Sequence, residues 1–338
     1  MTQSQASKGR REGPLVSVDL WDELGDRRQR VEQALHSALD RHSHGAPPSL
    51  VEAMGYSLFA PGKRLRPLLT ILACEAGGAT IERAMPAACA VEMVHTYSLI
   101  HDDLPAMDND DLRRGQPTCH KKFGEALAIL AGDGLLTLAF ELIGRGYGPR
   151  TAAVSCVELA AGAGAAGMVG GQVLDLEAEG RLPASRDREG AGDLETHSLP
   201  YGRGSPDPNE LEAIHCRKTG ALFRSALRLG LYAAGAESDD GVSSNVLADA
   251  DAFAEAFGLA FQVTDDLLDV ESSAETIGKP VGKDAARGKL TYPGLLGVAE
   301  SRRRAEALGR EAREQLAPLG PAADRLLELV SFVLRRDR

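Results

Sequence analysis

The chain has 338 residues, which is enough for one large domain or two ordinary ones. Its formal net charge of −11 and pI near 5.3 argue against binding to nucleic acid or to an anionic membrane, since both require a basic face. Five scattered cysteines without a CxxC pair are typical of reduced thiols in a cytoplasmic protein. An anionic ligand would therefore need locally placed cations.

The N-terminal residues are polar and lack the apolar core of a secretory signal, so we expect a disordered tail over residues 1–17. The longest uncharged run, 159–174, covers sixteen residues and contains five glycines. It is too short and too rich in glycine for a membrane-spanning helix. We therefore expect no membrane span.

Apolar residues recur at intervals of three and four through most of the chain, which is the period of amphipathic helices. Convincing alternating strand patterns are absent from the sequence. The predicted helices cover residues 20–39, 84–100, 126–143, 151–174, 209–234, 248–268 and 302–316. Breaks fall at clusters of glycine and proline. The pattern predicts an all-α protein.

Three cations in residues 61–67 lie at a predicted turn and helix start. Arg113 and Arg114 form a second basic pair, and residues 215–220 and 277–284 add lysines beside glycines. Arginine side chains and helix N-termini bind diphosphates well. Each of these segments alone would more often be a charged patch on the surface.

The helix predicted over 84–100 runs into an aspartate-rich segment, 101–111. Asp102 and Asp108 are six residues apart, about 600° of rotation on an ideal helix, which would put them on different faces. Pro105 lies between them and has no amide hydrogen to continue the helix. We therefore expect a bulge or helix end that returns Asp108 toward Asp102.

Residues 180–208 contain Gly, Pro, Ser, Asp and Arg but few large apolar side chains, and they predict a long mobile surface loop. A linker between two domains is the alternative. Helix restarts at the end of this segment, where Asp207 can cap, Pro208 can take the first helical position and Glu210 can complete a capping box.

A second acidic segment follows the loop, at the end of the helix predicted over 248–268. Asp265 and Asp269 are four residues apart and share a helix face, so both can point into one cavity. Because acidic segments lie on both sides of the loop and the site needs both, we favour one domain over residues 18–338 with a loop insertion.

The density of carboxylates in the two segments predicts a bound cation. Two like charges 4 Å apart repel by about 4 kcal/mol at an effective dielectric near 20. The candidate ligands are hard oxygens, which favours Mg²⁺, and Mg²⁺ usually shares its coordination with substrate phosphates. The two segments therefore predict a phosphorylated substrate held between facing helices. A solvated acidic helix end is the alternative for either segment alone.

These motifs together resemble those of the trans-isoprenyl diphosphate synthases, closest to the bacterial short-chain farnesyl and geranylgeranyl diphosphate synthases. The matching blocks run from about residue 58 to residue 297: GKRLRP, VEMVHTYSLIHDDLPAMDNDDLRRGQPTCHKKFGEALAILAGDGLL, GMVGGQVLDL, HCRKTGALF, FQVTDDLLDV and IGKPVGKDAARGKLTYPGLLG. The departures are the long 180–208 loop and Asn109, where another aspartate is common. The resemblance implies a homodimer whose single large bundle of about ten or more helices surrounds a deep central cavity.

The resemblance also implies roles for individual residues. Three Mg²⁺ ions would clamp the allylic diphosphate through Asp102, Asp103, Asp108, Asp265 and Asp269. The same diphosphate would be bound by Arg113, Lys218 and Lys279, and that of isopentenyl diphosphate by Lys63, Arg66, His95 and Arg114. Thr219 and Gln262 would face the carbocation, with Gln172 and Asp175 as supporting partners. Without the motif, His95 would be interpreted as a core histidine and the two lysines as surface residues.

The implied reaction joins isopentenyl diphosphate head-to-tail to dimethylallyl or geranyl diphosphate by ionisation, condensation and elimination. Tyr97 and Ser98 lie five and four residues before Asp102, where the family controls product length. An aromatic residue at the fifth position is typical of enzymes that stop at C15, so we expect farnesyl diphosphate. The alternative is geranylgeranyl diphosphate (C20), and Tyr97 would then be an ordinary core aromatic.

Two further functions remain open at this point. A terpene cyclase also ionises a diphosphate with Mg²⁺, but it would not need the site formed by Lys63, Arg66 and His95. A non-catalytic synthase subunit typically loses one aspartate motif, whereas this chain keeps both.

Overall fold

The computed structural model describes residues 24–182, 207–235, 241–275, 290–316 and 322–335. The predicted N-terminal tail, most of the predicted loop and Lys279 lie outside these ranges. The helices of the described part are α2 (Gly25–His42), α3 (Pro48–Leu58), α4 (Leu65–Ala76), α5 (Ile81–Asp102), α6 (Cys119–Phe123), α7 (Glu125–Gly146), α8 (Pro149–Ala163), α9 (Met168–Ala178), α10 (Pro208–His215), α11 (Ala221–Ala234), α12 (Ser244–Glu275), α14 (Tyr292–Leu296), α15 (Val298–Leu316) and α16 (Asp324–Arg335).

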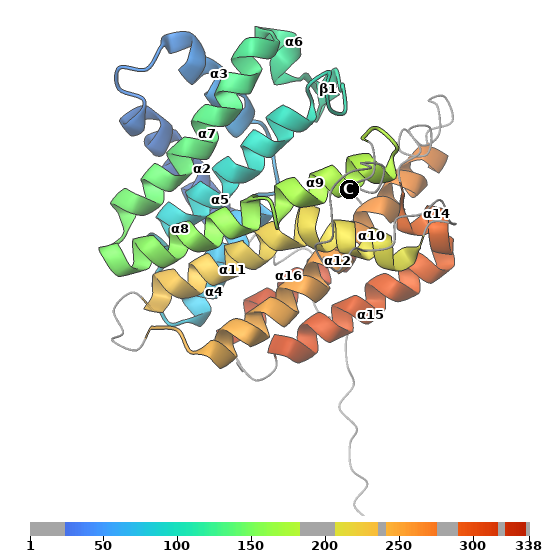
Figure 1. The fold of residues 1–338 in the computed structure, drawn as a ribbon. Coiled ribbons are helices and arrows are strands. Elements are labelled where there is room, and N and C mark those ends of the chain that lie inside the picture. The colour runs from blue at the N-terminus through green and yellow to red at the C-terminus, as the bar shows by residue number, and fades with distance from the viewer. Residues whose placement is uncertain (1–23, 183–206, 236–240, 276–289, 317–321, 336–338) are drawn as a thin grey trace, which may run out of the picture.

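The helices form one all-α bundle in which the first half of the chain, blue to green in Figure 1, packs against the yellow-to-red second half. Helix α5 packs against α4, α7 and α11, and α11 in turn packs against α12. α5 is buried around most of its circumference, with small side chains such as Ala87 and Ala88 fully enclosed. The predicted fold class is confirmed.

Aromatic rings and glycines fix how closely α11 approaches its neighbours. Phe223 of α11 and Phe257 of α12 are fully buried and meet edge to face, with ring centroids 5.3 Å apart. Seven residues further along α11, a Cβ added to Gly230 would lie only 2.2 Å from the carbonyl oxygen of Thr70 on α4. α4 and α11 therefore cross with their backbones almost in contact.

Two predicted helices are interrupted. The helix predicted over 151–174 is α8 and α9 with a break between them, and a Cβ on Gly167 at that break would lie 2.1 Å from the Gly162 carbonyl oxygen. The helix predicted over 209–234 contains a π-helical turn, η2 (Cys216–Gly220), between α10 and α11. Its predicted start is confirmed, because the Asp207 side chain accepts a hydrogen bond from the Asn209 amide at 3.0 Å.

The sequence pattern missed a short antiparallel hairpin formed by β1 (Leu112–Arg113) and β2 (Gln116–Pro117). The two residues between the strands, Arg114 and Gly115, have φ of 53° and 78°, as a tight hairpin turn requires. Strands of two residues are too short to produce an alternating pattern.

Two stretches, Glu125–Gly146 and Pro149–Ala178, are long and apolar enough to cross a membrane by length and composition. The second is divided into α8 and α9 in the structure. Core helices of water-soluble proteins also pass this test. The expectation that the protein has no membrane span stays a prediction.

Candidate active site

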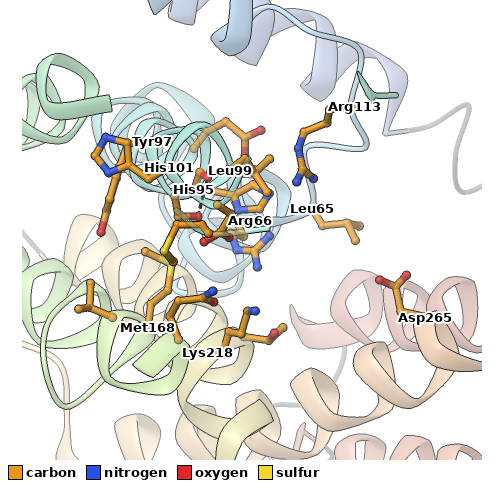
Figure 2. Close-up of a pocket in the computed structure, with 18 of the residues that line it drawn as sticks. Leu65, Arg66, His95, Tyr97, Leu99, His101, Arg113, Met168, Lys218 and Asp265 are labelled. Carbon is orange, nitrogen blue, oxygen red and sulfur yellow. Dashed lines mark hydrogen bonds between the residues drawn. The ribbon is translucent and has the colours of Figure 1, made fainter. Parts of the chain in front are cut away.

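A cavity of about 1090 Å³ lies between the two halves of the bundle, bordered by α4, α5, α9, η2 and α12. Asp102 at the end of α5 and Asp265 on α12 both line it. Figure 2 shows Asp265 and Lys218 on the side of the cavity that faces Arg66 and His95. The two acidic segments thus meet at one hollow, as the sequence predicts.

The first acidic segment turns back on itself directly after α5. The helix ends at Asp102, and the amide of Asp108 donates a 2.8 Å hydrogen bond to the Asp102 carbonyl. Asn109 completes the turn with a left-handed φ of 51°, and its amide bonds the Leu104 carbonyl. The predicted helix end at Pro105 is confirmed, since it returns Asp108 to Asp102.

Asp103 has a different environment from its neighbour. It is 3% exposed, and its carboxylate accepts hydrogen bonds from Arg113 Nε at 2.8 Å and Nη2 at 2.6 Å. Asp103 does not line the cavity, whereas Arg113 does. Its role as a metal ligand stays a prediction, and in the structure it holds Arg113 at the cavity edge.

Asp102 is buried enough for its charge to be costly. Burial raises the pKa of Asp102 to about 6, Lys218 opposes that shift, and the nearby Asp108 adds to it. Asp108 accepts a 3.3 Å hydrogen bond from Arg181 Nη1. A cation placed beside Asp102 would restore its ionised form.

The second acidic segment contributes its three aspartates unequally. Asp265 is exposed to the cavity, and Asp269, one turn further along α12, is exposed outside it. Asp266 is buried and accepts hydrogen bonds from Gln262 Nε2 at 2.9 Å and from the Tyr292 amide at 3.0 Å. Asp266 therefore ties α12 to α14 and orients Gln262.

Lys218 and Thr219 reach the cavity from the π-helical turn η2. Such turns insert one residue into a helix and are frequent at functional sites. Gly171 of α9 packs directly against this turn, where an added Cβ would lie 2.2 Å from the Lys218 amide nitrogen. Lys218 Nζ lies 2.5 Å from Asp175 Oδ2, and Thr219 Oγ1 donates to Gln262 Oε1 at 3.2 Å. The turn thus presents a cation and a hydroxyl side by side.

Gln172 and Asp175, the expected supporting partners, both lie on α9. Asp175 pairs with Lys218. Gln172 lines the cavity, and its buried Nε2 has no hydrogen-bond partner in the described part of the chain. A buried donor without an acceptor is costly, so it marks a place where a polar ligand atom can bind.

One wall of the cavity is strongly basic. It contains Arg66 on α4, His95 on α5, Lys63 just before α4 and Arg114 in the β1–β2 turn. Arg66 lies 4.5 Å from the centroid of the Phe223 ring, and burial lowers its pKa to about 10 despite Glu92 and Asp265. Burial, followed by Arg66 and Arg114, lowers the pKa of His95 well below its ordinary value. Clustered cations of this kind favour an anionic ligand.

The aspartate oxygens at the cavity suit a Mg²⁺ ion that is also coordinated by a bound ligand. Among the described residues, no group of three His, Cys, Asp or Glu side chains lies close enough to enclose a metal ion. Mg²⁺ usually binds through one or two carboxylates together with substrate phosphates. Asp102 on one wall and Asp265 on the other fit that arrangement, because both offer hard oxygen atoms. Asp108 does not line the cavity, although its backbone is bonded to that of Asp102.

Comparisons with known proteins show the family of this chain. Residues 47–318 match a model of the polyprenyl synthetase family. The chain belongs to that family. As a member, the protein is a prenyltransferase. It is 43% identical over 324 residues to a dimethylallyltranstransferase of Fischerella ambigua, covering 95% of this chain and 85% of that protein.

A second relative is the geranylgeranyl diphosphate synthase of Cyanophora paradoxa, 41% identical over 336 residues that cover 95% of this chain and 98% of that one. Among solved structures, an FPP/GFPP synthase from Zymomonas mobilis superposes with a TM-score of 0.74 at 33% identity, covering 94% and 99% of the two chains. Other similar curated proteins, from Catharanthus roseus and Arabidopsis thaliana, are also named geranylgeranyl pyrophosphate synthases.

Sequence reasoning missed the residues that hold the site together. Asp266 was not assigned a role, although its spacing of four residues from Gln262 permits the side-chain hydrogen bond between them. Arg64 and Glu92 were also unassigned, and their pairing at 2.8 Å joins residues 28 apart. No local spacing rule predicts that contact.

Proposed function

We propose that the protein condenses isopentenyl diphosphate with an allylic diphosphate in a Mg²⁺-dependent reaction to give geranylgeranyl diphosphate. The observation that carries the proposal is a single cavity with Asp102 and Asp265 on facing walls and a separate basic wall beside them. A head-to-tail condensation needs two anchored diphosphates over one apolar space. A terpene cyclase would have no use for the second anion site.

The two diphosphates would bind at different ends of the polar region. Arg66, His95 and Lys63 lie on the α4–α5 side and would hold isopentenyl diphosphate. Arg113 and Lys218 lie near Asp102 and would hold the allylic diphosphate. Because both diphosphates would be bound in place, the two substrates would react in a fixed relative orientation and would not depend on a random encounter.

Asp102, Asp108 and Asp265 would hold Mg²⁺ between the walls. When bound, the ions neutralise the leaving diphosphate, so that the allylic C–O bond can ionise. Lys218 lines the same cavity and adds a positive charge there. Lys279, outside the described residues, stays a proposed member of this group.

Thr219 and Gln262 would face the allylic carbocation. Because Gln262 Nε2 donates to Asp266, the amide oxygen is the end of Gln262 that meets Thr219 and the cavity. A carbonyl dipole with its negative end toward the cavity stabilises a cation without capturing it covalently. The released diphosphate remains the nearest base for the final proton loss, so no protein base is required.

The apolar end of the cavity supports a C20 product. Tyr97 packs edge-on against His101, with centroids 5.6 Å apart, and His101 Nε2 lies 3.1 Å from the Ile129 carbonyl. Ile129, Val169 and Val173 line the cavity and remain 43%, 46% and 42% exposed, so the described residues of one chain do not seal that end. Relatives named geranylgeranyl diphosphate synthases favour the same product. Farnesyl diphosphate is the second candidate.

We also propose that the protein is a homodimer. Two consecutive helices carry exposed apolar side chains: Ile129 and Leu130 on α7, and Val154 and Val157 on α8. Apolar surface of this kind is typical of interfaces between subunits. Sedimentation of the purified protein tests the proposal, with a monomer at micromolar concentration as the contrary result.

The activity is tested by incubating purified protein with Mg²⁺, isopentenyl diphosphate and each allylic diphosphate in turn, then measuring chain length after dephosphorylation. We expect mostly the C20 alcohol. A dominant C15 alcohol would overturn the proposed product length. A cyclised hydrocarbon, or no condensation at all, would overturn the proposed reaction.

A further inference from the structure

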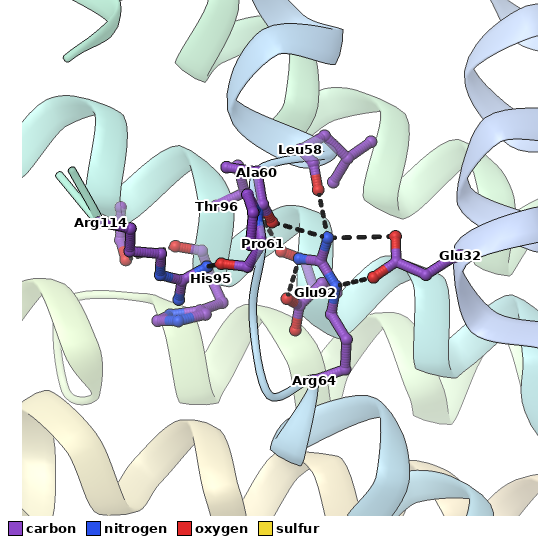
Figure 3. Close-up of polar contacts among 10 residues, drawn as sticks. Glu32, Leu58, Ala60, Pro61, Arg64, Glu92, His95, Thr96 and Arg114 are labelled. Atoms are coloured by element: carbon purple, nitrogen blue, oxygen red, sulfur yellow. Dashed lines mark hydrogen bonds and ion pairs between the residues drawn. The ribbon is translucent and has the colours of Figure 1, made fainter. Parts of the chain in front are cut away.

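Arg64 lies between two residues assigned to isopentenyl diphosphate, Lys63 and Arg66, yet its surroundings differ from theirs. Its side chain is 2% exposed. Its guanidinium is enclosed by protein acceptors: Glu32 Oε1 at 2.7 Å from Nε, Glu92 Oε1 at 2.8 Å from Nη1, and the carbonyls of Leu58 and Ala60 at 2.9 and 3.1 Å from Nη2. Figure 3 shows these contacts around a single guanidinium. Arg64 therefore has little donor capacity left for a substrate.

The backbone of Arg64 explains why this residue needs such support. Its φ and ψ of 53° and 38° are left-handed, a conformation that L-residues with a Cβ adopt at a cost. Arg64 lies immediately before α4. Its turn therefore sets the orientation of Lys63 relative to α4 and the position of Arg66 in the first turn of that helix. Anchoring of the guanidinium compensates for this cost.

The acceptors of Arg64 come from separate parts of the fold. Glu32 belongs to α2, and Glu92 belongs to α5 one turn before His95. Glu92 is itself buried, at 4% exposed. The ion pair between Arg64 and Glu92 therefore fixes the distance between the turn that carries Lys63 and the helix that carries His95.

A second arginine holds the same loop from the opposite side. Arg114 Nη1 donates to the Pro61 carbonyl, as Figure 3 shows. A Cβ added to Gly62 would lie 2.6 Å from that nitrogen, so a side chain at residue 62 would displace the Arg114 guanidinium from this position. Residues 61–66 are thus clamped between Arg64 and Arg114.

We propose that Arg64 is a positioning residue: through Glu92 and Glu32 it sets the geometry with which Lys63, Arg66 and His95 bind the diphosphate of isopentenyl diphosphate, and it does not contact that substrate. This inference rests on the proposed function. It predicts an effect confined to one of the two substrates, because Arg113, Lys218 and the aspartates depend on other contacts.

The test compares Arg64→Gln and Glu92→Gln, singly and combined, in the condensation assay. We expect KM for isopentenyl diphosphate to rise about tenfold or more in each variant, while KM for the allylic diphosphate changes less than about twofold. Both substitutions break the same Arg64–Glu92 ion pair. The KM of the double variant for isopentenyl diphosphate should therefore be close to that of either single variant, and the two increases should not multiply. Arg64→Lys, which keeps the charge but loses the fork, should give a smaller rise.

Arg27→Gln is the matched control. Arg27 and Glu75 form a partly buried ion pair at 3.1 Å between α2 and α4, the helices that Glu32 and Arg64 also connect. Arg27→Gln should lower the melting temperature and leave both KM values unchanged. If it raises KM for isopentenyl diphosphate as much as Arg64→Gln does, the effect is general destabilisation and the inference fails.

Direct binding of inorganic diphosphate without Mg²⁺ separates this inference from the proposed reaction. We expect Arg64→Gln and Arg64→Lys, each shown by circular dichroism to be folded, to bind inorganic diphosphate more weakly than the unmodified protein whether or not condensation is observed. A wild-type protein that binds inorganic diphosphate but makes no product overturns the proposed reaction alone. Folded Arg64 variants with unchanged diphosphate affinity and unchanged KM overturn the inference.

Discussion

The two acidic segments have similar compositions but different surroundings. The first lies at the end of a buried helix, where Asp102 is partly buried and Asp103 is paired with Arg113. The second lies along α12, where Asp265 and Asp269 are exposed and only Asp266 is buried. Local sequence supplies the carboxylates in both cases, whereas the fold decides which of them face the cavity.

Neighbouring aspartates in each segment have different contacts. In each segment one carboxylate lines the cavity and the next holds a structural partner: Asp102 beside Asp103, and Asp265 beside Asp266. Consecutive residues on a helix point in directions about 100° apart. We therefore expect the two members of each DD pair to differ in function, and the predictions below test that division.

The largest effect is expected within the second segment. Replacing Asp265 by alanine should lower turnover about 10³-fold, as for the loss of a group that stabilises charge in the transition state. Asp269→Ala should cost far less, since Asp269 does not line the cavity. Steady-state kinetics at saturating Mg²⁺ measure both variants. Equal losses would show that the two aspartates act alike.

Much of this arrangement could be predicted from the sequence, and the limits have physical causes. The spacing around Pro105 predicted the return of Asp108 to Asp102, because proline breaks a helix wherever the helix lies. By contrast, the chemistry of Lys63, Arg64 and Arg66 is similar, and only the left-handed turn with its distant acceptors buries Arg64. The break between α8 and α9 likewise depends on contacts that hydrophobic periodicity does not encode.

The next largest effect concerns Lys218, the cation that most opposes the pKa shift of Asp102. Gly171→Ala would place a Cβ 2.2 Å from the Lys218 amide, so η2 must move. A displacement near 1 Å at a catalytic group can cost about 10²-fold in rate. We expect a loss of this size for Gly171→Ala.

The control for that variant is Gly144→Ala on α7, where nothing lies within 4 Å of an added Cβ. It should keep full activity and gain about 0.5–1 kcal/mol of stability from the loss of glycine's freedom. Full activity in Gly171→Ala would show that the contact between α9 and η2 does not position Lys218.

A third prediction distinguishes Asp266 from Asp265 by stability. Asp266→Ala removes the acceptor of the Tyr292 amide, which should cost about 1–3 kcal/mol because a buried donor loses its partner. Asp265→Ala should change the free energy of unfolding by less than about 0.5 kcal/mol, since Asp265 is exposed. Urea denaturation of both variants measures the difference, and the reverse order of stability would refute the assignment.

The smallest effect concerns the cost of keeping Asp102 charged. Its pKa in the fold, about 6, exceeds the ordinary value of 3.8, so folding favours the protonated form. The penalty for the ionised form is absent below the ordinary pKa, grows as the pH rises between the two values, and is complete above pH 6.

Asp102→Asn removes this penalty, so the variant should be more stable than the wild type by about 1–3 kcal/mol at neutral pH without Mg²⁺. The advantage should shrink as the pH falls below the folded-state pKa. Denaturation curves in EDTA across this pH range measure it. An advantage that is independent of pH would contradict the assigned environment of Asp102.

The central claim is that Asp102 and Asp265 act from facing walls on one diphosphate. Calorimetric binding of inorganic diphosphate with Mg²⁺ tests it in the wild type, in Asp102→Asn, in Asp265→Asn and in the double variant. We predict that each single substitution weakens binding about 100-fold or more and that the double variant is little worse than either, because both break the same bridge. Losses that multiply in the double variant, or a single variant that binds as the wild type does, would contradict the account.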